Sequence, residues 1–119
     1  MTVSLLCMSH TPLMAFNDPG AEARAEVDAV LARARAFVAE VAPTLVVSFG
    51  PDHYNGFFYD LMPPFAVCLA GSGVGDFDTA TGPFRVPEGV ALGMAEAALA
   101  SGVDVAISRG AQLDHGAVQ

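Results

Sequence analysis

Short apolar runs alternate with two alanine-rich segments along this chain, and that alternation limits the fold more than any other feature. The apolar runs cover residues 2–8, 44–49, 65–70 and 103–108, and turn-forming residues bound each of them. Runs of this kind, nearly free of polar side chains, are typical of strands buried on both faces of a sheet. The pattern therefore predicts an α/β fold, with a mostly parallel sheet and flanking helices.

The two alanine-rich segments have helical spacing. Within residues 21–41, apolar side chains recur every three or four positions and form one face of a helix. Asp18 and Pro19 predict the start of this helix, and Pro43 predicts its end. A second helix is predicted over residues 87–100. A strand, a helix and a strand in this order predict a βαβ unit with parallel strands.

The remaining segments are predicted to be loops. Residues 50–64 are rich in aromatic side chains, residues 71–82 are rich in glycine and aspartate, and residues 110–119 follow the last apolar run. Two helices cover both faces of four apolar strands poorly. Residues 1–119 are therefore predicted to be a single α/β region, which is either the incomplete N-terminal part of a larger α/β domain or a chain that packs against a partner.

Composition excludes several classes of partner. The 119 residues carry a formal net charge of -8, with five arginines and no lysine. No basic footprint for nucleic acid or for an anionic membrane surface is present. No apolar run approaches the roughly 18 residues that span a bilayer, and the N-terminus lacks the basic region of a signal peptide. The sequence predicts a cytoplasmic protein with no nucleic-acid or membrane partner, whose Cys7 and Cys68 are reduced and buried.

All three histidines, His10, His53 and His115, follow an apolar run by a few residues. If these runs are parallel strands, their carboxyl ends share one edge of the sheet, which is where ligands bind in open α/β folds. Imidazole is the commonest metal ligand and the commonest general acid or base. The sequence therefore predicts that the histidines gather into one functional region.

Two histidines and one carboxylate form the ligand set of non-haem iron(II) oxygenases, and zinc accepts a similar set with water in the open position. The spacing does not choose between the two metals. The candidate carboxylates are Asp52, Asp60, Asp76 and Asp114. Asp52 and Asp114 each adjoin a histidine in the sequence, which makes simultaneous ligation by both neighbours awkward, so a hydrogen-bonding role behind a metal ligand suits them better.

Aromatic side chains cluster after His53. They could wall a pocket for a planar apolar substrate, or they could serve core packing and a subunit contact. This set comprises Tyr54, Phe57, Phe58, Tyr59 and Phe65.

Three sequence motifs together resemble the class III extradiol ring-cleavage dioxygenases. The motifs are LCMSHTPLM, SFGPDHYNGFFYDLMPPF and LDHGAVQ, and they occur in the family's order. The resemblance runs through essentially the whole chain, including Asn17-Asp18-Pro19 and Gly75-Asp76-Phe77. Family chains are considerably longer, so this sequence is similar to their N-terminal portion.

The resemblance implies an iron(II)-dependent enzyme that uses dioxygen to open a catechol ring beside its hydroxyl groups, in aromatic-acid catabolism. The expected substrate is a catechol, for example one with a propionate side chain. By the same resemblance, His10 and His53 bind the iron and His115 is an acid/base catalyst. Tyr54, Phe57 and Asp114 are expected in the substrate pocket, and a homo-oligomer is expected.

The family's glutamate iron ligand and a further catalytic histidine lie in its C-terminal part and have no counterpart here. The resemblance therefore predicts that these 119 residues alone are inactive. Two other readings stay open at this point: a zinc-dependent hydrolase on a similar scaffold, and a truncated non-enzymatic binding or assembly module.

Overall fold

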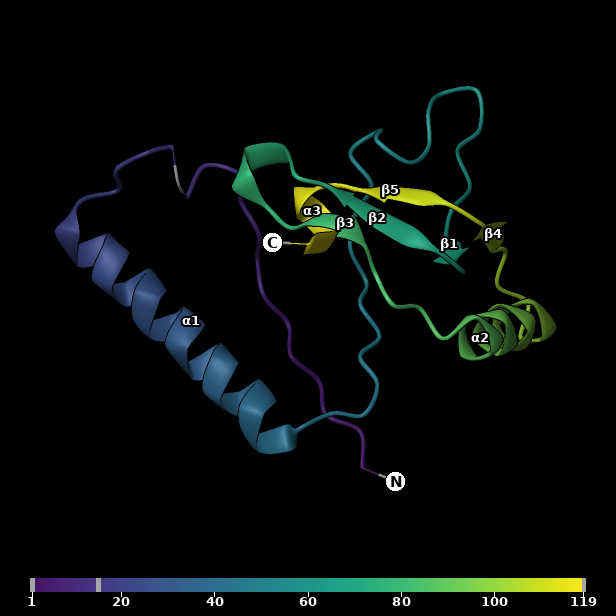
Figure 1. The fold of residues 1–119 in the computed structure, drawn as a ribbon, viewed down its shortest axis with the longest axis horizontal. Helices are drawn as coiled ribbons and strands as arrows, with labels where there is room; N and C mark the ends of the chain where they lie inside the picture. Colours follow the sequence, from purple (N-terminus) through teal and green to yellow (C-terminus); the bar gives the residue numbers. More distant parts are fainter. Residues whose placement is uncertain (1, 15, 119) are drawn as a thin grey trace. The chain divides into compact units, whose positions relative to one another are not determined.

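The computed structural model describes residues 2–14 and 16–118, and their contacts divide the chain into two compact units. One unit is Met1–Ser48 and the other is Phe49–Gln119. The helices and strands of each unit are labelled in Figure 1. Together they form a mixed α/β structure, so the predicted class is confirmed.

The first unit contains one long helix, α1 (Ala21–Val41), as predicted. Its N-cap is Gly20 rather than Asp18. Asp18 instead accepts a hydrogen bond from the backbone N–H of Gly20 at 3.1 Å, which shapes the turn just before the helix. The helix ends where Ala42 adopts a left-handed conformation with φ 43°, directly before the proline that was expected to stop it.

The prediction of strands over residues 2–8 and 44–49 is wrong. Among the described residues, every strand pairing lies between Ala66 and Leu113. Val46 is 72% exposed, which contradicts burial on both faces of a sheet. A strand exists through hydrogen bonds to a neighbour, and an apolar run does not specify that neighbour.

The second unit contains two small sheets instead of one parallel sheet. β1 (Ala66–Cys68) pairs in parallel with β4 (Ala106–Ser108). In the other sheet, β2 (Gly71–Val74) is central, antiparallel to β3 (Thr81–Pro83) and parallel to β5 (Ala111–Leu113). Among the described residues two of the three strand pairings are parallel, which agrees with the prediction of mostly parallel pairing, but the prediction of one sheet that includes all the apolar runs is wrong.

Residues 71–82 form a hairpin, not the loop that their glycine content predicted. β2 and β3 are joined by the 3₁₀ helix η1 (Asp76–Asp78), which follows Gly75 at φ 75°. At Gly73 a Cβ atom would collide with the main-chain oxygen of Ala80, so the hairpin can close only around a glycine. Glycine here serves close backbone approach within a sheet, a use that composition does not distinguish from a flexible loop.

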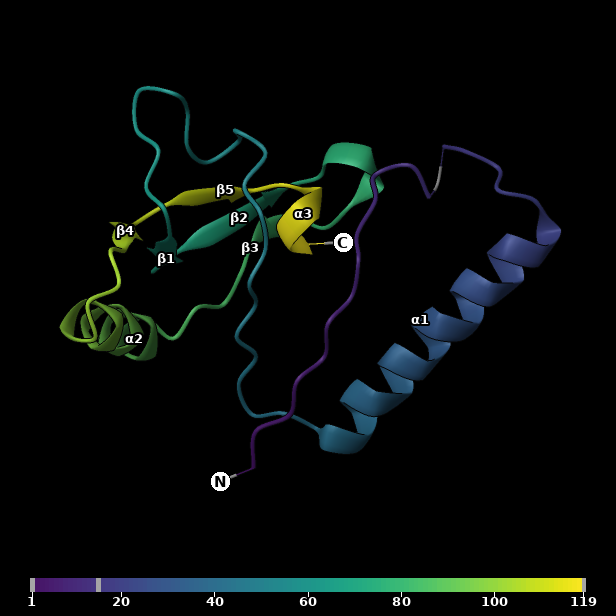
Figure 2. The same ribbon diagram turned by 180° about the vertical axis from the view of Figure 1, so that it is seen from behind.

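The end of the chain also has regular structure where a loop was predicted. β5 leads through Asp114 into the short helix α3 (His115–Val118), as Figure 2 shows from behind. The main-chain oxygen of Asp114 accepts a hydrogen bond from Ala117 N–H at 3.0 Å. Its Oδ1 accepts another from Gly116 N–H at 2.9 Å. Asp114 thus caps the first turn of α3.

The predicted second helix is present as α2 (Glu88–Ala100), and it packs on β1 and β4. Its buried side chains are Ala91 and Ala95, four residues apart on one face, and their small size allows close contact with the strands. Leu69 and Ala111 are the buried apolar side chains of the second unit's strand region. β2 leads into η1 and β5 leads into α3, the segments that carry Asp76 and His115.

Two further expectations concern the state of the cysteines and membrane-spanning helices. Both cysteines are free, as expected, but Cys7 is exposed and Cys68 only half-buried. Burial raises the pKa of the Cys68 thiol, and the nearby charge of Asp52 adds to that effect. In the described part of the chain, no helix has both the length and the apolar character needed to cross a membrane.

Candidate functional site

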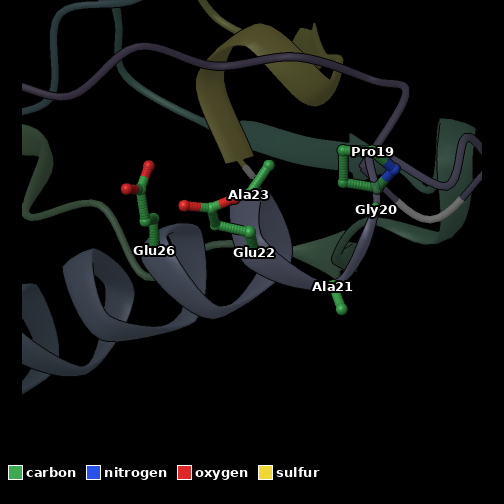
Figure 3. Close-up of a pocket in the computed structure, with 6 residues that line it drawn as sticks. All are labelled: Pro19, Gly20, Ala21, Glu22, Ala23 and Glu26. Carbon is green, nitrogen blue, oxygen red and sulfur yellow. The ribbon is translucent and has the colours of Figure 1, made fainter.

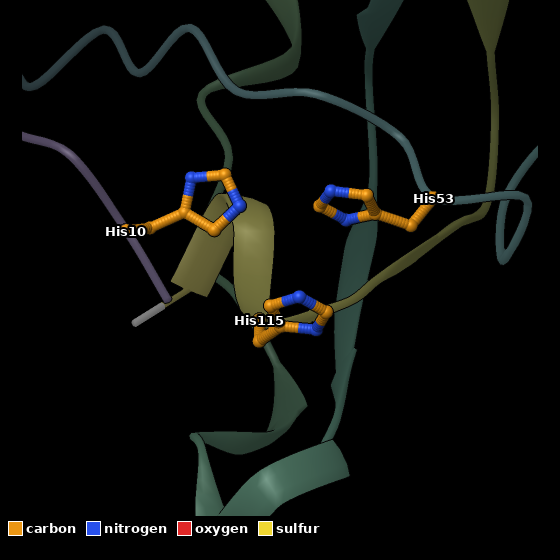
Figure 4. Close-up of side chains that lie close together, drawn as sticks. All are labelled: His10, His53 and His115. Carbon is orange, nitrogen blue, oxygen red and sulfur yellow. The ribbon is translucent and has the colours of Figure 1, made fainter. Parts of the chain in front are cut away.

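Two of the three predicted site histidines lie face to face in the second unit. The rings of His53 and His115 stack with centroids 4.7 Å apart and an interplanar angle of 5° (Figure 4). His53 comes from the loop before β1, whereas His115 is the first residue of α3. The side chain of His115 is only 10% exposed, while that of His53 is 41% exposed. The pair thus has one buried and one accessible ring.

The buried carboxylate of Asp114 holds both the ring and the backbone of His53 in place. Oδ2 of Asp114 lies 3.0 Å from Nδ1 of His53, and it also accepts the backbone N–H of His53 at 3.1 Å. The side-chain amide of Asn55 donates to the same oxygen at 2.9 Å. Asp114 is 1% exposed, so these contacts fix the loop around His53 to the end of β5.

The charge state of Asp114 determines the hydrogen-bond direction to His53. Burial would raise the pKa of this carboxyl, but hydrogen bonds from Asn55, from the N–H groups of Gly116 and His53, and from the His53 ring hold that pKa below 3.8. The carboxylate is therefore ionised at neutral pH and can only accept. Nδ1 of His53 must then donate its proton, which leaves Nε2 with the lone pair that binds a metal or takes a proton.

A second carboxylate holds His115. Oδ2 of Asp76 lies 2.6 Å from Nδ1 of His115, and Oδ1 accepts the backbone N–H of His115 at 2.9 Å. The ring of Phe77 meets the His115 ring edge-on, with centroids 5.0 Å apart. Each imidazole of the stacked pair therefore has its own carboxylate partner.

Ligand atoms of Asp76, Asp114 and His115 all lie within 4.8 Å of one another, which is close enough for a shared ion. Three of the four carboxylate oxygens, however, already accept hydrogen bonds from backbone N–H groups, and the fourth, Oδ2 of Asp76, lies 2.6 Å from the ring nitrogen Nδ1 of His115. These hydrogen bonds favour a network that orients the two imidazoles, rather than a metal site among these three residues.

Tyr54 and Phe57, the aromatic residues expected in a pocket, follow His53 closely in the chain. Tyr54 adopts a left-handed backbone with φ 62° and stacks on Tyr59 with centroids 4.7 Å apart. Its hydrogen bond with Tyr59, with smaller effects of burial and the Asp52 charge, raises the pKa of Tyr54. Phe57 is half-buried and its backbone N–H donates to Asp52 at 3.1 Å. Contact of Tyr54 and Phe57 with a substrate stays a prediction.

Other predicted residues are placed as follows. Asp114 lies beneath His53, where it matches the hydrogen-bonding role that its position in the sequence suggested, and its part in a substrate pocket stays a prediction. Asp52 accepts the backbone N–H of Gly56 at 2.8 Å and shapes the loop after His53. His10 belongs to the first unit, and its role as a ligand stays a prediction.

Sequence reasoning missed Asn55 and Phe77 as parts of the site. Asn55 lies in the second quoted motif, two positions after His53, and Phe77 lies in the Gly75-Asp76-Phe77 segment that the resemblance also covers. Their contacts bridge residues far apart in the chain, 59 positions in the case of Asn55 and Asp114. Local spacing carries no signal for such contacts.

The first unit has a shallow hollow at the start of α1 (Figure 3). It is lined by Pro19, Gly20, Ala21, Glu22, Ala23 and Glu26. Its two carboxylates belong to an exposed helix turn, and the hollow contains no predicted site residue. The chemistry that the sequence predicted therefore lies elsewhere.

Comparison with known proteins decides the family. Residues 4–119 match the family model described as the catalytic LigB subunit of aromatic ring-opening dioxygenase. The chain belongs to the LigB family. This confirms the resemblance that the three motifs indicated.

Relatives within this group are close in sequence. The chain is 56% identical to 2,3-dihydroxyphenylpropionate/2,3-dihydroxicinnamic acid 1,2-dioxygenase 1 of Dechloromonas aromatica. Two other relatives are named 2,3-dihydroxyphenylpropionate/2,3-dihydroxicinnamic acid 1,2-dioxygenase. The chain is 54% identical to the one from Azotobacter vinelandii and 56% identical to the one from Rhodococcus rhodochrous. Each match covers 100% of this chain and 38% of the relative. The chain thus spans well under half the length of these LigB relatives.

Proposed function

We propose that this LigB chain forms part of an iron(II)-dependent extradiol dioxygenase that opens the ring of a catechol such as 2,3-dihydroxyphenylpropionate. The observation that carries the proposal is the stacked pair of His53 and His115, each ring held by its own carboxylate. The names of relatives that are 50–56% identical support the substrate class.

The residues present fit a metal. Because Nδ1 of His53 donates a hydrogen bond to Asp114, Nε2 is the nitrogen that can bind an ion. A carboxylate that hydrogen-bonds the other ring nitrogen is the usual support of a metal-binding imidazole. We assign His53 and His10 as iron ligands. Iron(II), when bound, supplies a Lewis acid that polarises the bound oxygens and an electron route between substrate and dioxygen.

The chain's own residues then have separate tasks. His53 would bind the iron, and Asp114 orients its ring. His115 exchanges protons with the substrate at Nε2 because Nδ1 faces Asp76. Acid/base catalysis of this kind contributes roughly 10²–10⁴-fold in rate. Tyr54 and Phe57 are proposed to contact the aromatic ring of the substrate.

The proposal also includes a cellular location, an oligomeric state and the identity of the metal. A cytoplasmic location agrees with two free cysteines. A homo-oligomer agrees with the many exposed apolar side chains, Phe49 at 91% exposure among them. Iron, as opposed to another divalent metal, agrees with the oxygenase names of the relatives.

The test is an oxygen-uptake assay on the protein expressed from its complete gene, with 2,3-dihydroxyphenylpropionate as substrate. We expect stoichiometric iron and one dioxygen consumed per catechol opened, followed by the absorbance of the ring-opened product. Purified protein that contains zinc and consumes no oxygen would favour the hydrolase reading instead. Protein without stoichiometric metal, bound to a stable partner, would favour an assembly module.

Gly116→Ala is expected to weaken metal binding about 10–100-fold, the usual effect of disturbing the support of a metal-binding histidine. A Cβ atom at Gly116 would lie 2.7 Å from Cε1 and 3.0 Å from Nδ1 of His53, so the ring must leave Asp114. Iron titration monitored by metal content measures the effect. Gly93→Ala, where a Cβ would meet open space in α2, is the matched control and should bind iron like the wild type. Equal affinity in both variants would contradict the role of the His53–Asp114 contact.

A further inference from the structure

Asp76 makes two polar contacts with His115, one through each of its carboxylate oxygens. Oδ2 contacts the ring nitrogen Nδ1 at 2.6 Å, and Oδ1 accepts the backbone N–H at 2.9 Å. The two residues are 39 positions apart, so this contact ties η1 to the start of α3. A two-point contact fixes both the position of His115 and the orientation of its ring, which the His53 and Phe77 rings also border.

The backbone of η1 is shaped to present Asp76. Gly75 precedes it at φ 75°, and Phe77 and Asp78 follow at φ 51° and 61°, in the left-handed region that non-glycine residues seldom adopt. The Thr79 hydroxyl lies 2.7 Å from the main-chain oxygen of Asp76 and 3.3 Å from its Oδ1, which holds the turn in place. Strained residues of this kind cluster at functional sites.

We infer that Asp76 is a positioning residue that keeps the proton of neutral His115 on Nδ1, so that Nε2 carries the lone pair toward the substrate. The reason is chemical: an ionised carboxylate only accepts hydrogen bonds, so the ring nitrogen that faces it must donate. The other nitrogen is then the one that takes up and returns a proton. This inference rests on the proposed acid/base role of His115.

Asp76→Asn tests the inference because it keeps the shape and inverts the proton arrangement. Oδ1 receives the backbone N–H of His115, a donor that cannot reverse, so the amide oxygen must occupy that position. The amide NH₂ then faces Nδ1, which has to accept, and the ring proton moves to Nε2. In the catalytic triad of serine proteases, the equivalent aspartate-to-asparagine change lowers kcat about 10⁴-fold through the wrong tautomer.

Two measurements are made on the wild type, on Asp76→Asn and on Asp78→Asn. The first is the His115 tautomer from ¹⁵N NMR of the ring, above the pH range in which imidazole titrates, with diamagnetic Zn²⁺ in place of iron. The second is the split between kcat and KM in oxygen uptake. Asp78 is the matched control because it is exposed, lies in the same turn and has a left-handed φ that asparagine tolerates.

We expect Nδ1–H in the wild type and in Asp78→Asn, and Nε2–H in Asp76→Asn. Only the Asp76 variant should lose kcat, by about 10²–10⁴-fold, with KM little changed. A wild-type His115 with its proton on Nε2 overturns the inference, even if the variant does not fold. An inverted tautomer with unchanged kcat overturns it as well. A wild type that cleaves no catechol overturns the proposed function, while the NMR result still decides whether Asp76 sets the tautomer.

Discussion

His53→Ala is expected to abolish ring cleavage and to remove iron from the protein. Disturbing the partner behind a metal-binding histidine typically lowers metal affinity about 10–100-fold, and loss of the ligating nitrogen itself should lower it further. In this chain the loss also frees Asp114, whose Oδ2 lies 3.0 Å from Nδ1 of His53. Metal content after equilibrium dialysis and oxygen uptake with a catechol measure the two effects.

His53→Gln serves as the control for the hydrogen bond to Asp114. Glutamine keeps an amide N–H that can reach the Asp114 carboxylate, but it offers no imidazole nitrogen to a metal. If His53 matters only as the hydrogen-bond partner of Asp114, the glutamine variant should retain more iron and activity than the alanine variant. Full iron content and full activity in either variant would contradict the assignment of His53 as a ligand.

Asp114→Ala is expected to lower the free energy of unfolding by about 2–4 kcal/mol. The carboxylate is 1% exposed and accepts hydrogen bonds from His53, Asn55 and Gly116, all of which lose their acceptor. Denaturant unfolding measures the difference. Asp104→Ala, at an exposed position, is the control and should change stability by less than about 0.5 kcal/mol. A similar small change at Asp114 would show that its hydrogen bonds do not hold the loop.

The same carboxylate makes stability depend on pH with a definite sign. Hydrogen bonds hold the pKa of Asp114 in the folded chain below its unfolded value of 3.8, despite its burial. Its contribution is therefore complete well above pH 3.8 and is lost as the pH falls through the lower folded value. The unfolding free energies of wild type and Asp114→Ala should differ at neutral pH and converge in acid. Parallel curves across that range would contradict the charge state assigned to Asp114.

Local patterns predicted the helices well because a helix is stabilised by contacts between residues three and four apart. The bounds of α1 follow the apolar spacing and Pro43, and α2 begins one residue after Pro87. The strands were harder to predict, since pairing joins distant segments. β2 and β5, with Gly71 opposite Ala111, both lie in segments that were predicted to be loops.

The candidate site was predicted in part. The positions of His53 and His115 after apolar runs indicated a shared region, and the structure stacks the two rings. The supporting reason was wrong, because residues 44–49 form no strand among those described. What brings the rings together is the hydrogen bonding of Asp114 to the loop after residue 49, across 61 positions of sequence.

The sequence alone determined the family, the helices α1 and α2 and the choice of the three histidines as candidate site residues, because motifs and helical spacing are local features of neighbouring residues. Only the tertiary structure decided which carboxylate serves which imidazole. Asp114 adjoins His115 in the chain but binds the ring of His53, while the ring of His115 is bound by Asp76. The physical reason is geometric: the backbone turn at the end of β5 points neighbouring side chains in different directions, and their partners come from loops set by strand pairing.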